Sequence, residues 1–129
     1  MALTALELSP EELKQYHPWE AFHRRRAETR VEVAKRRRRA YAAALKAAKL
    51  LKEKFGAKEV ILFGSLARRG SFTLYSDIDL AVRGIDPLKF YAAGAAIERV
   101  DLSFQIDLVE LETCSPAVFK NIEKDGKPL

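Results

Sequence analysis

The sequence predicts an α/β (α+β) domain: a small mixed sheet with helices on one face, preceded by a long basic N-terminal helix. Three observations support this fold class. Short apolar runs within 60–63, 78–82 and 104–109 have the branched or alternating character of strands. Segments with helical spacing separate or follow these runs. The stretch 19–55 contains no helix breaker and is rich in Lys and Arg.

Composition limits the class of protein. The 129 residues suit one domain with a moderate core, and the hydrophobic content of 48% is typical of a globular chain. No apolar run approaches the roughly 18 residues of a membrane span, and Met1–Leu8 lacks the basic start of a signal peptide. The single Cys114 excludes an internal disulfide and a cysteine-rich zinc site. We therefore expect a cytoplasmic protein with no membrane partner.

Charge divides the chain unevenly. The stretch from Arg24 to Lys54 holds 13 Lys or Arg against 3 Glu, a net charge of +10. Because the whole chain carries +5, the remainder carries −5. The two parts are therefore expected to do different jobs.

The N-terminal region is predicted to be helical. Ser9-Pro10-Glu11-Glu12 has the cap, proline and glutamate of a helix start, and Pro18 ends that short helix. A second helix then runs from Trp19 to Phe55, where Gly56 stops it. Its apolar stripe consists of Ala27, Val31, Ala34, Tyr41, Ala44, Leu45, Ala48, Leu50, Leu51 and Phe55.

A straight helix over 19–55 would be roughly 55 Å long, too long to be covered by a core of this size. We expect the half after Tyr41 to pack on the sheet, and the earlier half to project or to fold back at a break. Residues 1–55 would then form a helical extension, and residues 56–129 a minimal core domain.

Two further helices are predicted between and after the strands. Asp86-Pro87 begins one of them, and Ser115-Pro116 caps the other, which Gly126 ends. The residues expected to face inward are Leu88, Phe90, Tyr91, Ala95 and Ile97 in the first, and Val118, Phe119 and Ile122 in the second.

The strands carry the candidate chemistry. In the run Ser76–Val82, alternation places Asp77 and Asp79 on one face and the apolar residues on the other. Asp107 is placed in the same way on a later strand. Two carboxylates separated by roughly 7 Å of strand repel each other unless a cation lies between them. Mg²⁺ suits oxygen ligands that substrate phosphates complete.

A Gly64-Ser65 turn follows the first strand, and Arg68 follows the turn. Glycine lets the backbone approach a ligand closely, and a hydroxyl and a guanidinium suit phosphate. An ordinary turn is the alternative when the dipeptide is considered alone. It is neither a serine-hydrolase elbow nor a Walker loop, because the glycines and the lysine of those motifs are missing. Together with the three acids, the turn suits metal-assisted phosphoryl or nucleotidyl transfer.

These motifs resemble the minimal nucleotidyltransferases of the DNA polymerase beta-like superfamily. The resemblance covers roughly residues 56 to 126 and rests on Phe63-Gly64-Ser65, Arg68 to Gly70, Asp77-Ile78-Asp79 and Asp107. The chain departs from the pattern in the spacer after Ser65, which is one residue longer than expected, and in Leu66, where many members carry Arg. The longer spacer leaves open whether Arg68 or Arg69 meets phosphate.

The resemblance implies an adenylyltransferase that moves AMP from ATP to an acceptor, with this chain as the antitoxin of a HEPN-type toxin. Asp77, Asp79 and Asp107 would be the catalytic and metal-binding residues, holding two Mg²⁺ ions. Gly64, Ser65 and Arg68 would bind the phosphates. In this interpretation Asp107 completes the second metal site or takes the proton of the acceptor.

Two alternatives remain at this point. One is a nucleic-acid-binding or structural module with a vestigial transferase site; the other is a small-molecule adenylyltransferase of the aminoglycoside type. The basic run Arg36–Arg39 also has several interpretations: a solvated helix face, a surface for phosphates of nucleic acid, or a surface for a second copy or an acidic partner. We predict that the segment from Arg24 to Arg39 docks a protein.

Overall fold

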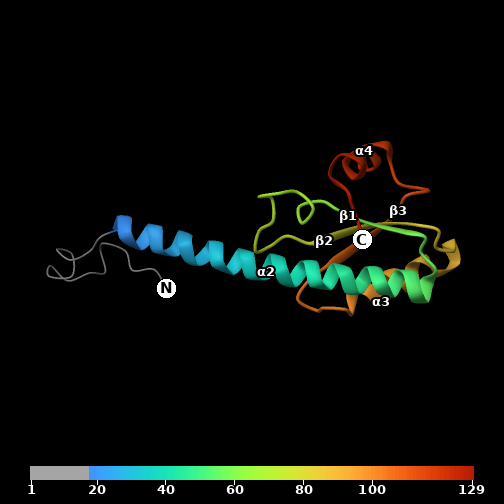
Figure 1. The fold of residues 1–129 in the computed structure, drawn as a ribbon, viewed down its shortest axis with the longest axis horizontal. Helices are drawn as coiled ribbons and strands as arrows, with labels where there is room; N and C mark the ends of the chain where they lie inside the picture. The colour runs from blue at the N-terminus through green and yellow to red at the C-terminus, as the bar shows by residue number, and fades with distance from the viewer. Residues whose placement is uncertain (1–17) are drawn as a thin grey trace. The chain divides into compact units, whose positions relative to one another are not determined.

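The computed structural model describes residues 18–129, and it confirms the fold class (Figure 1). The short helix predicted after Ser9 lies outside the described residues. The elements in chain order are α2 (Pro18–Phe55), β1 (Glu59–Phe63), β2 (Ile78–Arg83), the 3-10 helix η2 (Pro87–Lys89), α3 (Phe90–Glu98), β3 (Ile106–Glu110), α4 (Pro116–Asp125) and β4 (Lys127–Pro128).

The chain divides into two compact units, residues 1–32 and 33–129. In the first unit, the described residues are the early turns of α2, and the side chains of 23–32 are exposed. Helix α2 is continuous from Pro18 to Phe55, so the break considered from the sequence is absent from this helix. In the second unit, the turns of α2 after Val33 pack with the sheet.

The four strands form one mixed sheet in the order β3-β2-β1-β4. Strand β1 is antiparallel to β2 and to β4, whereas β2 and β3 are parallel. The register places Phe63 opposite Asp79, and Asp79 opposite Asp107. Sequence patterns did not predict β4, because its two residues are too few to show any alternation.

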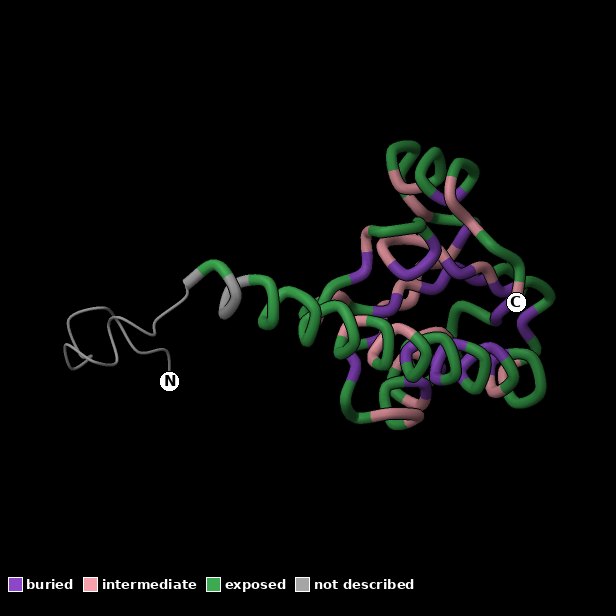
Figure 2. The backbone as a smooth tube through the Cα atoms, turned by 60° about the vertical axis from the view of Figure 1, so that its left-hand side comes forward, coloured by how far each residue is buried: buried purple, intermediate pink, exposed green. Residues whose placement is uncertain are grey.

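Alanines form the face of α2 that packs on the sheet. The buried residues of this helix are Ala40, Ala43, Ala44, Ala47, Ala48 and Leu51. The predicted stripe is therefore correct at Ala44, Ala48 and Leu51 but wrong at Tyr41 and Leu45, which are 37% and 47% exposed. Small side chains let the helix approach the sheet closely, which turns the larger residues outward. In Figure 2, buried purple segments begin only in the later turns of α2.

Helices cover both faces of the sheet rather than one. The later part of α2 and helix α3 lie on one face, and α4 lies on the other (Figure 1). Helix α4 packs through Ile122 and Val118 against Ala81 and Leu111, together with Ile61 of β1. This second, small core covers only part of the face that carries the acids.

The two later helices begin where the sequence predicts, but the residues that they bury differ from those predicted. Asp86 accepts a hydrogen bond from the N–H of Leu88, and the chain then passes through η2 into α3. Ala93 and Ile97 are the buried residues of α3, whereas Leu88 and Tyr91 are 92% and 85% exposed. Ser115 caps α4 as predicted. The inward positions predicted for Leu88, Tyr91, Ala95 and Phe119 are wrong, because these residues are all exposed. The buried side of α3 carries Ala93 and Ile97, and that of α4 carries Ile122, so each inward face is narrower than the predicted one.

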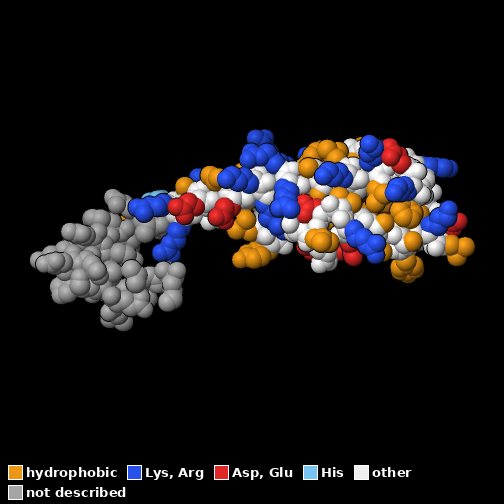
Figure 3. Space-filling view, turned by 90° about the horizontal axis from the view of Figure 1, so that it is seen from below, with side chains coloured by type: hydrophobic (Ala, Val, Ile, Leu, Met, Phe, Trp, Pro, Cys, Tyr) orange, Lys and Arg blue, Asp and Glu red, His pale blue; other side chains and the backbone are white. Residues whose placement is uncertain are grey.

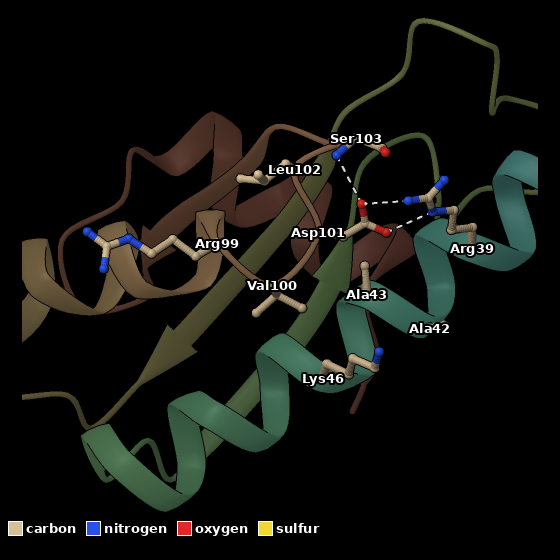
Figure 4. Close-up of a pocket in the computed structure, with 9 residues that line it drawn as sticks. All are labelled: Arg39, Ala42, Ala43, Lys46, Arg99, Val100, Asp101, Leu102 and Ser103. Carbon is tan, nitrogen blue, oxygen red and sulfur yellow. Dashed lines mark hydrogen bonds and ion pairs between the residues drawn. The ribbon is translucent and has the colours of Figure 1, made fainter.

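An ion pair joins α2 to the loop that precedes β3. The Nε of Arg39 donates to Oδ2 of Asp101 at 2.9 Å, and its Nη2 donates to Oδ1 at 3.2 Å (Figure 4). A hydrogen bond from the backbone N–H of Ser103, followed by the Arg39 contact, holds the pKa of Asp101 below its ordinary range. The loop is thereby tied to the helix on one side of the sheet.

Among residues 18–129, no helix combines the length and the apolar character that crossing a bilayer requires.

Candidate active site

The three acids predicted from the sequence lie at one end of strands β2 and β3. Asp79 is the second residue of β2, and its parallel neighbour in β3 is Asp107. Asp77 immediately precedes β2 instead of belonging to it, and its side chain is exposed. The sheet therefore fixes the backbone positions of Asp79 and Asp107, whereas Asp77 lies in the loop before β2.

Gly64 lies directly against the carboxylate of Asp79. Its φ is +75°, a left-handed conformation that favours glycine. A Cβ built on residue 64 would overlap Oδ2 of Asp79. Glycine at this position therefore serves the packing of an acid of this chain, in addition to any approach of a ligand.

The charges around Asp79 oppose its ionisation. Partial burial raises the pKa of Asp79, and the charges of Asp107 and Asp77 raise it further. The Arg68 guanidinium acts in the opposite direction and lowers this pKa. The three carboxylates are thus close enough to repel one another, and Arg68 is close enough to reduce that repulsion.

The segment after β1 forms a compact turn. The N–H groups of Ala67 and Arg68 both donate to the carbonyl of Gly64 at 3.2 Å. Leu66 is fully buried, so the residue that departs from the family pattern is a core residue here. Within the described residues, no backbone acceptor pairs with the N–H of Ser65 or of Leu66.

A second turn holds the chain just before Asp77. The N–H of Thr73 donates to Oγ of Ser76 at 2.9 Å, and the two side-chain hydroxyls are 3.1 Å apart. The side chain of Phe72 is buried and anchors the start of this turn. Local hydrogen bonds of this kind favour turns over continued strand, so β2 begins only at Ile78.

Gln105 orients Asp107, a role that the sequence analysis missed. Its Nε2 donates to Oδ1 of Asp107 at 3.0 Å. Its carbonyl accepts the N–H of Ile78 at 2.9 Å, which joins the entries of β2 and β3. The available signal was spacing: residues two apart in an extended segment share a face, which would have placed Gln105 beside Asp107.

Arg36 was also missed as part of this region. Its Nη2 donates to the carbonyl of Ser76 at 3.3 Å, and its Nη1 donates to the carbonyl of Ser103 at 3.4 Å. The guanidinium lies 4.4 Å from the centre of the Phe104 ring. Two members of the run 36–39 therefore contact loops of this chain: Arg36, which is partly buried, and Arg39, which remains exposed.

Without substrate, the acidic end of β2 and β3 offers a divalent cation only part of its ligand set. In residues 18–129, no three carboxylate, imidazole or thiol groups converge into a preformed metal cage. The mutual repulsion that raises the pKa of Asp79 is nevertheless the situation that a bound cation relieves. Two or three carboxylate ligands with substrate phosphates completing the shell match the usual binding of Mg²⁺.

Two open pockets lie near the loop that leads into β3. One, of about 380 Å³, lies between α3 and β3, and Asp107 is in its lining with Phe90 and Tyr91. The other, of about 550 Å³, is lined by α2 and the loop 99–103 and includes none of the three acids (Figure 4). Proximity to the acids favours the first pocket as part of the site.

A mixed sheet that presents acids beside a glycine turn defines a nucleotidyltransferase-type protein. The profile of the polymerase beta nucleotidyltransferase family matches residues 46–129. The chain belongs to this family. No curated protein matches the chain significantly.

Solved structures of toxin–antitoxin complexes are similar to this chain. One, a complex with AMP-PNP, is 27% identical with a TM-score of 0.56, and the match covers 66% of this chain and 70% of the other. A variant of the MntA–HpeT complex is 30% identical with a TM-score of 0.54, and the match covers 65% of this chain and 68% of the other. A third structure is a tri-AMPylated HEPN toxin from Shewanella oneidensis in complex with its MNT antitoxin. It shows 26% sequence identity and a TM-score of 0.53, and the match covers 69% of this chain and 70% of the other.

Substituting Gly64 should separate the effect of its positive φ from the effect of its contact with the Asp79 carboxylate. Gly64→Ala places a methyl group where the Asp79 carboxylate lies, so we expect nucleotidyl transfer to fall by about a hundredfold. Gly56→Ala is the matched control, because Gly56 also has positive φ (+71°) but no atom within 4 Å of its added Cβ. Both variants should lose about 1–2 kcal/mol of unfolding free energy from backbone strain, measured by urea denaturation.

Equal activities of the Gly64 and Gly56 variants would contradict this account, because they would show that the contact with Asp79 does not matter to the reaction.

Proposed function

We propose that this chain is a Mg²⁺-dependent adenylyltransferase that transfers AMP from ATP to a protein partner of the HEPN toxin class. The observation that carries the proposal is the position of Asp79. Its carboxylate lies against the Gly64 turn, is the parallel neighbour of Asp107, and is repelled by Asp77 and Asp107. A site of this kind combines a place for a cation with a place for phosphates.

Each residue has a defined role in this proposal. Asp77 and Asp79 would hold the Mg²⁺ that accompanies the triphosphate, and Asp107 would complete the place for a second ion. Bound Mg²⁺ supplies charge neutralisation for the phosphates. The N–H groups of Ser65 and Leu66, the Ser65 hydroxyl and Arg68 bind the β- and γ-phosphates. We assign Arg68 rather than Arg69, because Arg68 is the arginine whose charge acts on Asp79.

The reaction is a displacement at the α-phosphorus of ATP. The acceptor hydroxyl oxygen forms a bond to that phosphorus, and the bond from phosphorus to the bridging oxygen of the β-phosphate breaks. Pyrophosphate leaves, and the hydroxyl proton passes to the carboxylate of Asp107. Gln105 holds that carboxylate by its 3.0 Å hydrogen bond, which fixes the orientation of Asp107 for the proton transfer.

The similarity to toxin–antitoxin complexes supports the choice of acceptor. One similar complex contains a tri-AMPylated HEPN toxin, and another contains AMP-PNP. By analogy, AMP is the group transferred and ATP is the donor.

Labelled ATP tests the proposed reaction. The chain is incubated with Mg²⁺, a co-expressed HEPN-type protein, and ATP labelled either at the α- or at the γ-phosphate. Label from the α-position alone should appear on the partner protein. Transfer of the γ-label would identify a kinase, label on small molecules would identify an aminoglycoside-type enzyme, and no transfer of either label would favour a vestigial site.

The acids of the first metal site should be essential. Asp77→Asn and Asp79→Asn should each lower transfer by at least about a thousandfold, since the triphosphate loses its cation. In metal-free buffer at neutral pH, Asp79→Asn should keep or raise the melting temperature, because the fold favours a neutral side chain at this position. The α-label assay measures the loss of transfer, and calorimetry in metal-free buffer measures the melting temperature. Full activity in either variant contradicts the assignment.

Asp107 should be needed for transfer but not for nucleotide binding. Asp107→Asn should abolish transfer but retain Mg-ATP affinity within about fivefold, because Asp77, Asp79 and the Gly64 turn remain. Isothermal titration gives the affinity, and the α-label assay gives the rate. Loss of nucleotide binding as complete as in Asp77→Asn would place Asp107 in the first metal site instead.

The basic segment from Arg24 to Arg39 is proposed to dock the partner through arginines that make no contact with loops of this chain. Arg24–Arg26 are exposed, and Figure 3 shows Lys and Arg side chains spread among apolar ones instead of gathered in one patch. Replacing 24–26 with Gln should weaken partner binding, most strongly at low salt, with ATP affinity unchanged. Replacing Lys120, Lys124 and Lys127 removes the same charge and serves as the control.

Three outcomes distinguish the occupants of this segment. Weaker binding of the HEPN-type protein supports the proposal, whereas loss of self-association in light scattering would identify a homodimer. RNA or DNA binding that falls steeply with salt and depends on 24–26 would assign the segment to nucleic acid.

A further inference from the structure

We propose that Arg36 is a positioning residue for nucleotidyl transfer: from α2, it holds the loop that carries Asp77 at a fixed distance from the loop that leads to Asp107. This inference rests on the proposed function of the acids. It assigns to the long helix a role in the site that is distinct from partner docking.

The need for such a residue follows from the sheet. Hydrogen bonding between β2 and β3 fixes Asp79 beside Asp107, but Asp77 precedes β2 and lies outside this register. The local turn of Thr73 with Ser76 shapes the loop without attaching it to β3. The hydrogen bond from the N–H of Ile78 to the carbonyl of Gln105 joins the strand entries, but within the described residues no backbone hydrogen bond links Ser76 or Asp77 to the segment before β3. A side-chain contact is therefore needed to hold the residues just before Ile78.

Arg36 makes the required connection. One terminal nitrogen donates to the carbonyl of Ser76, the residue immediately before Asp77. The other donates to the carbonyl of Ser103, and the guanidinium lies over the ring of Phe104, which is buried. A planar guanidinium presents its donors in a rigid fork, so two acceptors bound to it are held at a fixed separation.

The contacts suit positioning better than stabilisation. At 3.3 and 3.4 Å they are long, and both acceptors are neutral carbonyls. The Nε of Arg36 is shielded from solvent and has no acceptor within the described residues. Burying a charged group in this way is costly and brings little net stability. By comparison, Arg39 in the next turn pairs with a carboxylate at 2.9 Å.

The test compares Arg36→Lys and Arg36→Met with Lys49→Met, which removes an exposed cation from the same helix outside the segment proposed for docking. For both Arg36 variants we expect kcat to fall about tenfold to a hundredfold with KM for ATP within about threefold. Lysine keeps the charge but is a single point donor, so it should not restore kcat. Lys49→Met should behave as the unmodified protein in both constants.

Hydrogen exchange supplies a readout that is independent of activity. In both Arg36 variants, exchange should accelerate in 72–77 and 101–105, while β1 and the centre of β2 keep their protection. If Arg36→Met does not fold, Arg36→Lys decides the question by the same measurements. Unchanged kcat and unchanged exchange in a folded Arg36 variant would overturn the proposal, as would full rescue by lysine.

The two proposals fail separately. If the unmodified protein transfers no AMP, the proposed function fails, and the positioning role is then decided by exchange in the two loops alone. If the unmodified protein is active and the Arg36 variants match it, only the positioning role fails.

Discussion

The close contact between Gly64 and the carboxylate of Asp79 is the constraint on which the site depends. Strand β1 must end at Phe63 in register with Asp79, and the next residue must leave with positive φ and no side chain. The turn that follows is then brought over the acid, with Arg68 near enough to lower the pKa of Asp79. A single packing contact thus places the candidate phosphate-binding turn above the candidate metal-binding carboxylate.

This constraint has an electrostatic cost that the fold bears when no ligand is present. Asp79 is partly buried, and two other carboxylates repel it. Arg68 offsets the repulsion only partly, so a cation and a triphosphate that bring further positive charge and further oxygen ligands are favoured. The surrounding structure is accordingly tied down by other means: the alanine face of α2, the second core beneath α4, and the Arg39–Asp101 ion pair.

The sequence predicted the elements whose signals are local. Alternation identified the strands that carry Asp79 and Asp107, and the side-chain caps Asp86 and Ser115 located two helix starts. The prediction was weaker where tertiary packing decides. Alanine is only weakly hydrophobic, so an alanine face is hard to tell from its neighbours in the sequence. The predicted stripe of α2 therefore included Tyr41 and Leu45, which are exposed. The inward role of Arg36 depends on loops 40 and 67 residues away, which no periodicity within the helix reveals.

The central claim is that the three acids and the Gly64 turn together bind a metal–nucleotide complex. Crystals soaked with Mn²⁺ and a non-hydrolysable ATP analogue test it directly, because the anomalous signal of manganese locates the ion. We expect manganese between the carboxylates of Asp77 and Asp79, with the triphosphate over residues 64–68. Nucleotide bound instead in the basic pocket of Arg39, Lys46 and Arg99, with no manganese at the acids, would contradict the account.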